Sequence, residues 1–355
     1  FINKRIKLIM AYTTINKPTA HFNTKLYTGN AGTQSITGVG FQPDMVWLKK
    51  RSASGSHYIT DAVRGVNKVI FPDETNAEYT YSDGVSAFNS DGWTVGNNGG
   101  MNGSGATQVG WNWKAGNSSG SANTDGTITS TVSANTTAGF SIATWSGTGS
   151  NGSIGHGLGG VDCMIIKNTN SARDFYFWNK SMVYNTRLEL NNNEAFTTGT
   201  DNMTALPDAT KINMATSTQN NGSSQNYVGY FFQEKQGYSK FGNYTGNANA
   251  DGPFIYTGFK PALVIIKQSS GGNDWWIYDN KRDTFNLATH GLRPNISNAE
   301  VNYSATDTMN LDLLSNGFKI KSTDGALNGN GSSYIYMAFA EAPLVGTNNV
   351  PCTAR

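Results

Sequence analysis

Two patterns of apolar residues occur along this chain, and both are typical of β-strands. Short runs such as MVWL (45–48) and LVII (263–266) are continuously apolar, as expected of strands covered on both faces. Segments such as WTVGN (93–97) and QVGWNW (108–113) alternate apolar and polar residues, as half-buried strands do. Because no amphipathic helix stands between these segments, the pattern predicts an all-β protein.

Strands predicted between residues 25 and 114 are joined by turns rich in Gly, Asn, Asp and Ser, which favours antiparallel β-sandwiches over a βαβ sheet. The predicted strands are KLYTG (25–29), DMVWLKK (44–50), HYITDA (57–62), GWTVGN (92–97) and TQVGWNWK (107–114). We expect sandwiches of the jelly-roll or lectin-like type.

One segment of the chain occurs twice with similar sequence, and a third, less similar copy lies between the two. The stretch GFQPDMVWLKKRSASGSHYITDAVRG (40–65) aligns without gaps with GFKPALVIIKQSSGGNDWWIYDNKRD (258–283). Between them, DCMIIKN (162–168) and FYFWNKS (175–181) follow the same order. The chain is therefore interpreted as three tandem β units, with Met182 in the second unit where the other two have arginine.

This interpretation divides the chain into six parts. They are an N-terminal segment (1–18), β repeat 1 (19–117), a linker or edge strand (118–138), β repeat 2 (139–236), β repeat 3 (237–342) and a C-terminal tail (343–355). The linker begins with a flexible Gly/Ser/Asn stretch, whereas almost nothing separates repeats 2 and 3. We expect repeats 2 and 3 to be rigidly coupled, repeat 1 to sit slightly apart, and the modules to form an extended rod or knob.

Polar residues that recur in the units are better candidates for folding than for catalysis, because active sites are usually single. They are Lys49, Lys167 and Lys267 after the central strand, Asp61 and Asp279, Arg64 and Arg282, and Glu78, Glu194 and Glu300 after an Asn-rich turn. We expect each lysine stem to cover core while its charge pairs with a carboxylate at the end of the sandwich. A ligand-binding charge is the alternative.

The amino-acid composition disfavours nucleic acids and membranes as binding partners. Only 14% of residues are charged and the formal net charge is +2, which gives no basic field for nucleic acid or an anionic membrane. Cys163 lies in an apolar run and Cys352 near the end, so we expect two unpaired thiols, one of them buried. The opening stretch has an apolar run too short for a signal peptide or a bilayer span, and we expect a soluble protein.

Motifs for catalysis and metal binding are weak. The string GNSSG (116–120) matches the nucleophile pattern Gly-x-Ser-x-Gly but lacks the strand and helix that would expose the serine. His21, His57, His156 and His290 lack the spacing of a zinc site, and many aspartates lie in Asp-Gly turns, where they hold the turn more often than calcium. We predict no catalytic residue, no metal, no cofactor and no enzymatic activity.

Aromatic residues on a polar β scaffold are candidates for a sugar-binding surface, because a pyranose face stacks on Trp or Tyr. The candidate ligand-binding residues are Trp275, Trp276, Tyr278, Trp111 and Trp113. Since neighbours in a strand face opposite ways, one of Trp275 and Trp276 is expected to be buried and the other available. Core packing is the alternative for each of them.

Longer strings carry a resemblance to a known family. EKQGYSKFGNYTGNANADGPFIYTGFKPALVIIK (234–267), AGFSIATWSGTGSNGSIGHGLGGVDCMIIKN (138–168) and the ending AEAPLVGTNNVPCTAR (340–355) resemble repeat-containing virion structural proteins of marine and cyanobacterial tailed bacteriophages. The resemblance covers nearly all of the chain from residue 10 onward. It implies an outward-facing, non-enzymatic virion component that is assembled in the host cytoplasm and ends on the virion surface.

The functions that follow from this resemblance differ in location. The first is a capsid-decoration or short fibre subunit, expected to be a homo-oligomer that contacts other virion proteins and for which host-surface glycans are candidate ligands. The alternatives are a tail-fibre receptor-binding adhesin and a secreted carbohydrate-binding or glycan-active protein. Because the chain has no heptads for a coiled-coil shaft, the first is favoured.

Overall fold

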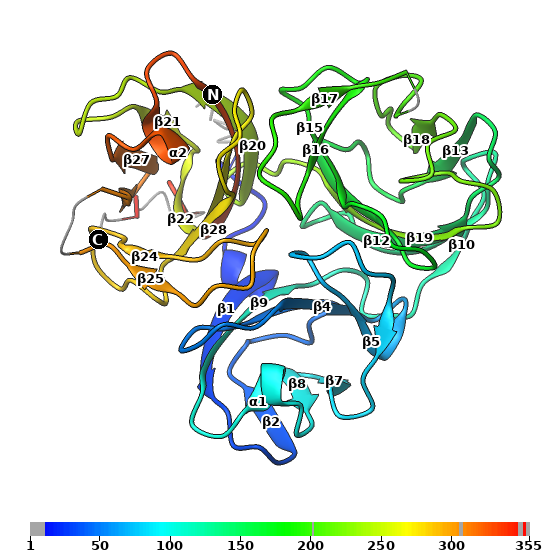
Figure 1. The fold of residues 1–355 in the computed structure, drawn as a ribbon, viewed down its shortest axis with the longest axis horizontal. Helices are drawn as coiled ribbons and strands as arrows, with labels where there is room; N and C mark the ends of the chain where they lie inside the picture. The colour runs from blue at the N-terminus through cyan, green and yellow to red at the C-terminus, as the bar shows by residue number, and fades with distance from the viewer. Residues whose placement is uncertain (1–10, 201, 305–307, 347–350, 353–355) are drawn as a thin grey trace, which may run out of the picture.

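A computed structural model describes residues 11–200, 202–304, 308–346 and 351–352, and it shows three β lobes around a common centre (Figure 1). The first ten residues of the predicted N-terminal segment and most of the last nine of the predicted tail lie outside the described residues.

Lobe 1 (22–113) begins after a short 3-10 helix at Pro18–Ala20. Its elements are β1 (Phe22–Thr28), β2 (Gln34–Thr37), β3 (Met45–Lys50), β4 (His57–Asp61), β5 (Gly65–Ile70), β6 (Tyr79–Thr80), β7 (Val85–Asn89), β8 (Gly92–Val95), α1 (Gly99–Asn102) and β9 (Thr107–Trp113).

The regular elements of lobe 2 (121–232) are all strands in the residues that the structure describes. They are β10 (Ser121–Asn123), β11 (Ser130–Asn135), β12 (Phe140–Ser146), β13 (Gly152–Gly155), β14 (Cys163–Asn168), β15 (Tyr176–Asn179), β16 (Thr186–Glu189), β17 (Thr197–Thr198), β18 (Lys211–Met214) and β19 (Asn226–Phe232). The stretch expected to be a linker or edge strand holds β10 and β11, which form the edge of the sheet next to β12, as the edge-strand alternative predicts.

Lobe 3 (239–343) again ends on a long strand. Its elements are β20 (Ser239–Thr245), β21 (Phe254–Tyr256), β22 (Phe259–Gln268), β23 (Trp276–Asp279), β24 (His290–Gly291), β25 (Val301–Asn302), β26 (Asn310–Leu314), β27 (Gly317–Lys321), α2 (Gly325–Asn328) and β28 (Ser333–Pro343).

The main sheets of the three lobes share an order of antiparallel pairing. It is β1-β9-β3-β4 in lobe 1, β12-β19-β14-β15 in lobe 2 and β20-β28-β22-β23 in lobe 3. Smaller sheets cover their outer faces, in the orders β2-β8-β7, β13-β18 and β21-β27-β26. The prediction of an all-β sandwich protein is therefore confirmed, whereas descent from one tandem unit stays an interpretation of the sequence.

Alternation along the central strands divides their side chains between two cores. In β3, Met45 and Trp47 face a central core, and Val46 and Leu48 face a core inside lobe 1. The strands β14 and β22 divide their residues in the same way. These sheets are covered on both faces, which is why their sequences are continuously apolar. The strand β9 was expected to be half-buried, but it is buried from Gln108 to Trp113 for the same reason.

The central core is built by all three lobes, and this corrects two expectations. Phe22 and Trp113 of lobe 1 stack around Phe339 of lobe 3, which also contacts the ring of Phe232 in lobe 2. Repeat 1 therefore does not sit apart, and the modules do not form an extended rod. Each lobe has an apolar face that it cannot bury alone, and closing three such faces on one another removes them all from water.

Candidate functional site

The charged residues predicted from the repeats gather where one lobe meets the next. We name these contacts junction I (lobe 3 with lobe 1), junction II (lobe 1 with lobe 2) and junction III (lobe 2 with lobe 3). At each junction, the turn after the fourth strand of one sheet faces the last strand of the following lobe.

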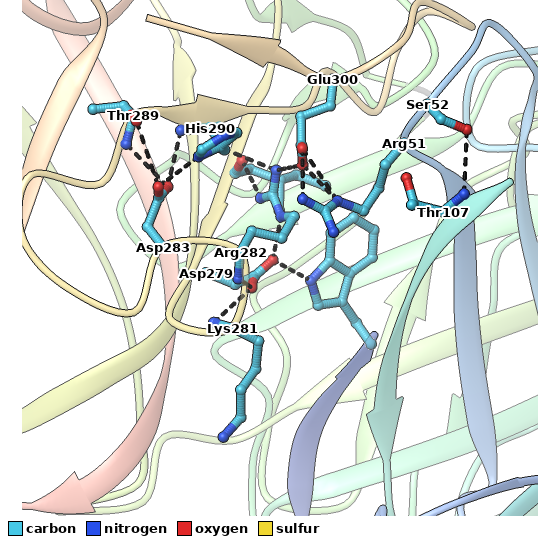
Figure 2. A network of polar contacts seen from close by, with 12 residues as sticks. Arg51, Ser52, Thr107, Asp279, Lys281, Arg282, Asp283, Thr289, His290 and Glu300 are labelled. Atoms are coloured by element: carbon cyan, nitrogen blue, oxygen red, sulfur yellow. Dashed lines mark hydrogen bonds and ion pairs between the residues drawn. The ribbon is translucent and has the colours of Figure 1, made fainter. Parts of the chain in front are cut away.

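Junction I holds a buried network, drawn in Figure 2. The Asp279 carboxylate accepts a hydrogen bond of 2.5 Å from Arg282 Nε and one of 3.1 Å from the indole Nε1 of Trp111 in lobe 1. Arg282 Nη1 also donates to Glu300 at 3.0 Å. The side chains of Asp279 and Arg282 have no exposed surface, so this ion pair exists only because its hydrogen-bonding capacity is met inside the protein.

Arg51 crosses junction I from lobe 1 and binds the same glutamate. Its Nη2 lies 2.7 Å from Glu300 Oε1, and its Nε lies 3.1 and 3.0 Å from the two carboxylate oxygens. Burial opposes ionisation of Glu300, but the hydrogen bonds from Arg51 and the charge of Arg282 outweigh it and hold the pKa of the carboxyl below its usual value. One carboxylate thus joins two guanidinium groups from different lobes.

Junction II repeats this arrangement with one difference. Asp61 accepts a 2.5 Å hydrogen bond from Arg64 Nε and a 2.7 Å hydrogen bond from the hydroxyl of Tyr230 in lobe 2. Arg64 Nη1 reaches Glu78 at 3.0 Å. Thr169 occupies the place of Arg51 and does not reach the glutamate through its side chain.

Junction III lacks the ion pair altogether. Asn179 and Met182 stand where the other lobes have the aspartate and the arginine, and Asn179 Nδ2 donates to the backbone carbonyl of Tyr336 at 3.3 Å. In the last strand of lobe 3, Met337 stands where Trp111 and Tyr230 supply a donor. The buried charge and the donor that satisfies it are absent together.

Backbone hydrogen bonds fix which residues correspond across the junctions. Glu300 N donates to Arg51 O and Glu78 N donates to Thr169 O, both at 3.0 Å, while Phe196 N donates to Ser269 O at 3.1 Å. Phe196, rather than Glu194, therefore corresponds to the two glutamates. The prediction for Glu194 is wrong because it matched residue type rather than spacing. Phe196 follows Met182 at the spacing at which Glu78 follows Arg64, and Glu194 itself is exposed.

The three recurring lysines are buried, but their charges do not pair with carboxylates. Lys49 Nζ donates to the carbonyls of Gly55 (2.5 Å) and Ser297 (3.0 Å), and the latter contact crosses junction I. Lys167 Nζ donates to Thr75 O at 2.7 Å across junction II and to Arg173 O. Lys267 Nζ binds the carbonyls of Gln268 and Gly271 within lobe 3. Carbonyl groups of the loops satisfy the ammonium groups, and the carboxylate pairing expected from the sequence is wrong.

Burial also corrects the prediction of a sugar-binding surface. Trp275, Trp276, Tyr278, Trp111 and Trp113 are all at most 4% exposed. Trp275 faces the central core and Trp276 the core of lobe 3, so the expectation that one of the two is available is wrong. The reason is the same as for the central strands: neighbouring lobes cover the face that an isolated sandwich would leave in water.

An asparagine five residues before the last strand of each lobe was missed by the sequence analysis. Asn102 Nδ2 donates to Asn30 Oδ1, Gly32 O and Gly96 O, and Asn328 Nδ2 donates to Asn247 Oδ1, Asn249 O and Ser322 O. Asn221 does the same for loops of lobe 2. Each side chain ties together loops at the outer end of its sandwich. A recurring Asn before a Gly-rich turn was the available signal.

The remaining candidate motifs have local roles. The Ser118 hydroxyl of the GNSSG string lies 3.3 Å from Ser133 Oγ in a bend before β10. His57 is buried, and its Nδ1 accepts a hydrogen bond from Trp47 Nε1 at 3.0 Å. Among the residues that the structure describes, no group of three or more His, Cys, Asp and Glu side chains is placed so that it could bind a metal ion. Cys163 is buried and Cys352 half-buried, and both are unpaired, as expected.

Cavities lie at all three junctions, and their linings differ. At junction II a cavity of about 400 Å³ is lined by Arg64, Glu78, Thr169 and several further hydroxyl groups. At junction III a cavity of about 200 Å³ is lined by Met182, Val183, Phe196 and Ile335, together with a few polar residues. At junction I a cavity of about 320 Å³ is lined by Thr24 and Leu26 of lobe 1 and Lys281 of lobe 3, and the guanidinium of Arg51 lies beside Glu300.

Comparison with known proteins gives one match. Residues 17–343 match a family model described as Domain of unknown function (DUF7483). No curated protein and no solved structure matches the chain. Within the described ranges, no helix has the length and apolar character needed to cross a membrane.

Proposed function

The chain belongs to the family described as Domain of unknown function (DUF7483), and we propose that it is a non-enzymatic structural protein on the exterior of a bacteriophage virion. In this proposal it is a capsid-decoration or short-appendage subunit. Its partners are other virion proteins, and further copies of the chain assemble with it in the host cytoplasm.

The observation that carries the structural role is the use made of the recurring polar residues. Arg64, Arg282 and Glu300 are enclosed in contacts between lobes, and Lys49 and Lys167 hold loops of neighbouring lobes. Groups with catalytic potential are thereby committed to holding three sandwiches as one block. Such cross-links resist local opening, which suits a protein that has to keep its shape on a particle surface.

The placement on a virion rests on the resemblance of the segments 138–168 and 234–267 to phage structural proteins. A compact block of three lobes, rather than a rod, favours a surface decoration or a short appendage over the shaft of a long fibre. Contact with host glycans stays a separate prediction, and any such contact requires side chains other than the five buried aromatics.

Copy number per particle tests the proposal. Purified virions of the phage that encodes the chain are digested, and this protein is quantified by mass spectrometry against the major capsid protein, with a replication enzyme of the same phage as the negative control. Hundreds of copies indicate a capsid decoration, and about three to eighteen indicate an appendage placed on a symmetry axis. Absence from particles that retain the capsid protein contradicts the proposal.

A further inference from the structure

We propose that the cavity at junction II is a binding site for a guanidinium group, as an arginine side chain carries, with Glu78 as its counter-ion. The inference rests on a comparison between two junctions of the same molecule. It does not depend on where the protein acts.

Junction I shows how a guanidinium group is held in this setting. Arg51 follows β3, its backbone nitrogen donates to Thr107 O at 2.8 Å, and its backbone carbonyl accepts from Glu300 N. From this position its side chain reaches Glu300 with three hydrogen bonds of 2.7 to 3.1 Å. The Arg51 side chain is 18% exposed and that of Glu300 is 9% exposed, so the pair is largely enclosed.

Thr169 has the same backbone setting at junction II. Its nitrogen donates to Asn226 O at 2.8 Å, and its carbonyl accepts from Glu78 N at 3.0 Å. The threonine side chain is shorter than that of arginine, and both Thr169 and Glu78 line the cavity of about 400 Å³. At junction I neither Arg51 nor Glu300 lines the cavity of about 320 Å³, whereas at junction II Thr169 and Glu78 both line the open space. The space beside the glutamate that Arg51 fills at junction I is therefore open at junction II, while the carboxylate is retained.

The lining of the cavity suits a polar cation. Hydroxyl groups come from Thr129, Thr131, Thr144 and Ser146, and Asn226 adds an amide. A guanidinium has five N–H donors, and a single carboxylate accepts hydrogen bonds from only some of them. Hydroxyl and amide oxygens of the cavity can accept hydrogen bonds from the remaining N–H groups. The planar fork of donors also matches the two oxygens of a carboxylate better than an ammonium does.

Two cationic side chains already lie beside Glu78, and their charges reduce the affinity of the cavity for a further guanidinium group. Arg64 is buried and binds Oε2 at 3.0 Å, and its charge is also met by Asp61. Lys68 lies 3.2 Å from Oε1, but its side chain is 41% exposed. An exposed pair of this kind contributes little, so an arriving guanidinium can displace the Lys68 ammonium. Glu300 shows that one carboxylate at this position accepts two guanidinium groups.

Junction III provides an internal contrast. Ser269 replaces the arginine there, but Phe196 replaces the glutamate, and the cavity of about 200 Å³ has a largely apolar lining. Without a carboxylate it has no counter-ion for a guanidinium. One binding site per chain is therefore expected.

The full chain is titrated with a small probe. Binding is measured by isothermal titration calorimetry and by the change in the melting temperature of the protein. The probe is N-acetyl-arginine amide, which has no charge except the guanidinium. Its neutral isostere N-acetyl-citrulline amide, the lysine equivalent and glucose are titrated in parallel. We expect the arginine probe to bind with a Kd on the order of 1 mM, the lysine probe more weakly, and citrulline and glucose not at all. An arginine-containing peptide that binds more tightly than the amide would identify a protein partner as the source.

Three variants and a matched control locate the site. Thr169→Arg supplies the group from within the chain and is expected to raise the melting temperature and abolish probe binding. Glu78→Gln is expected to weaken binding about tenfold or more, and Lys68→Gln to strengthen it a few-fold. Glu194→Gln removes an exposed carboxylate of similar sequence context and is expected to leave binding unchanged.

The results that overturn the proposal are equally specific. Equal binding of the arginine and citrulline probes would show that the cavity does not select a cation, and preferential binding of glucose would make it a saccharide site. Lack of any arginine binding, or arginine binding that survives Thr169→Arg, would remove the cavity as the site. Because Thr169→Arg retains Glu78 and adds an ion pair, loss of binding in that variant cannot be attributed to unfolding if its melting temperature is maintained.

Discussion

Trp111 and Asp279 lie 168 residues apart in the chain and are joined by a buried hydrogen bond of 3.1 Å from the indole nitrogen to the carboxylate. Tyr230 and Asp61 make the corresponding bond of 2.7 Å at the next junction. At the third junction, where the donor is replaced by Met337, the acidic residue is replaced by Asn179. The identity of each buried acid therefore follows the chemistry of the lobe that covers it.

A first prediction concerns the cost of separating Asp279 from Arg282. Arg282→Met leaves the carboxylate buried without its cation and is expected to lower the free energy of unfolding by about 3–5 kcal/mol. Adding Asp279→Asn recreates the combination of Asn179 and Met182, so the double variant is expected to lose less than the two single changes together. Urea unfolding measures all three.

The control for this cycle is Lys281→Ala, since Lys281 is exposed and adjacent in sequence. Its effect is expected to stay within about 0.5 kcal/mol. Strict additivity of the two changes at 279 and 282 would show that the residues do not act as a pair.

A second prediction concerns stability at alkaline pH. Burial lowers the pKa of Lys49 and Lys267 to about 8 and that of Lys167 to about 7, from 10.5 in the unfolded chain. Between about pH 8 and 10 the unfolded state therefore binds more protons than the folded state, and the free energy of unfolding is expected to rise with pH. A neutral amine retains two N–H groups, enough for the two carbonyls that each lysine contacts.

Above about pH 10 the direction reverses. Burial raises the pKa of Tyr230 and Tyr238, so their hydroxyls ionise first in the unfolded chain and stability is lost. Urea unfolding at intervals between pH 7 and pH 11 checks both limbs. Lys167→Met is expected to reduce the rise, and the exposed-site control Lys281→Met to leave it unchanged; a fall between pH 8 and 10 would refute the account.

A third prediction separates packing from ligand binding for the aromatic residues. Trp275→Ala removes a side chain that is 1% exposed, packs edge-to-face against Phe177 of lobe 2 and donates to Glu189 O at 3.1 Å. It is expected to cost about 3–5 kcal/mol of unfolding free energy. Phe285→Ala, at a side chain that is 76% exposed, is expected to change stability by less than about 0.5 kcal/mol. Thermal and urea unfolding compare the two, and similar small effects in both would contradict the burial of Trp275.

A fourth prediction concerns the asparagine that ties the loops of lobe 3. Asn328→Asp keeps the size of the side chain but removes the amide hydrogens that three oxygens accept, and it places a carboxylate among those oxygens. The expected loss of unfolding free energy is about 3 kcal/mol. The same exchange at the exposed Asn330 is the control, and equal melting temperatures of the two variants would argue against the role of Asn328.

The class of fold was predictable from the sequence because strand patterning is local. The apolar runs at 45–48 and 263–266 and the turn-forming residues around them are sufficient to predict buried central strands. The repeated Asp61/Asp279 and Arg64/Arg282 could also be assigned to structure rather than catalysis. The wrong predictions concern contacts between lobes: an aromatic that faces outward from one sandwich, such as Trp275, has the same sequence signature whether water or another lobe lies beyond it.

The cavity at junction II and the correspondence of Phe196 with the glutamates share this limit. Alignment by residue type selected Glu194, although Phe196 follows Met182 at the same spacing as Glu78 follows Arg64. The longer spacing from Arg282 to Glu300 in lobe 3 obscured this correspondence, and the hydrogen bond from Phe196 N to Ser269 O identifies the residue. Likewise, Arg51 and Thr169 can be compared as equivalent positions only after the structure shows that they contact Glu300 and Glu78.

The three lobes contact one another head to tail, with the turn after the fourth strand of lobe 3 on lobe 1, that of lobe 1 on lobe 2 and that of lobe 2 on lobe 3. Heterologous contacts of this kind close into a ring when the rotation permits and otherwise grow into open filaments. Here the ring closes within one polypeptide and fixes the number of lobes at three. A chain without lobe 1 would expose the acceptor Asp279 on lobe 3 and the donor Tyr230 on lobe 2, so lobe 3 of one molecule is expected to contact lobe 2 of the next and to form a polymer.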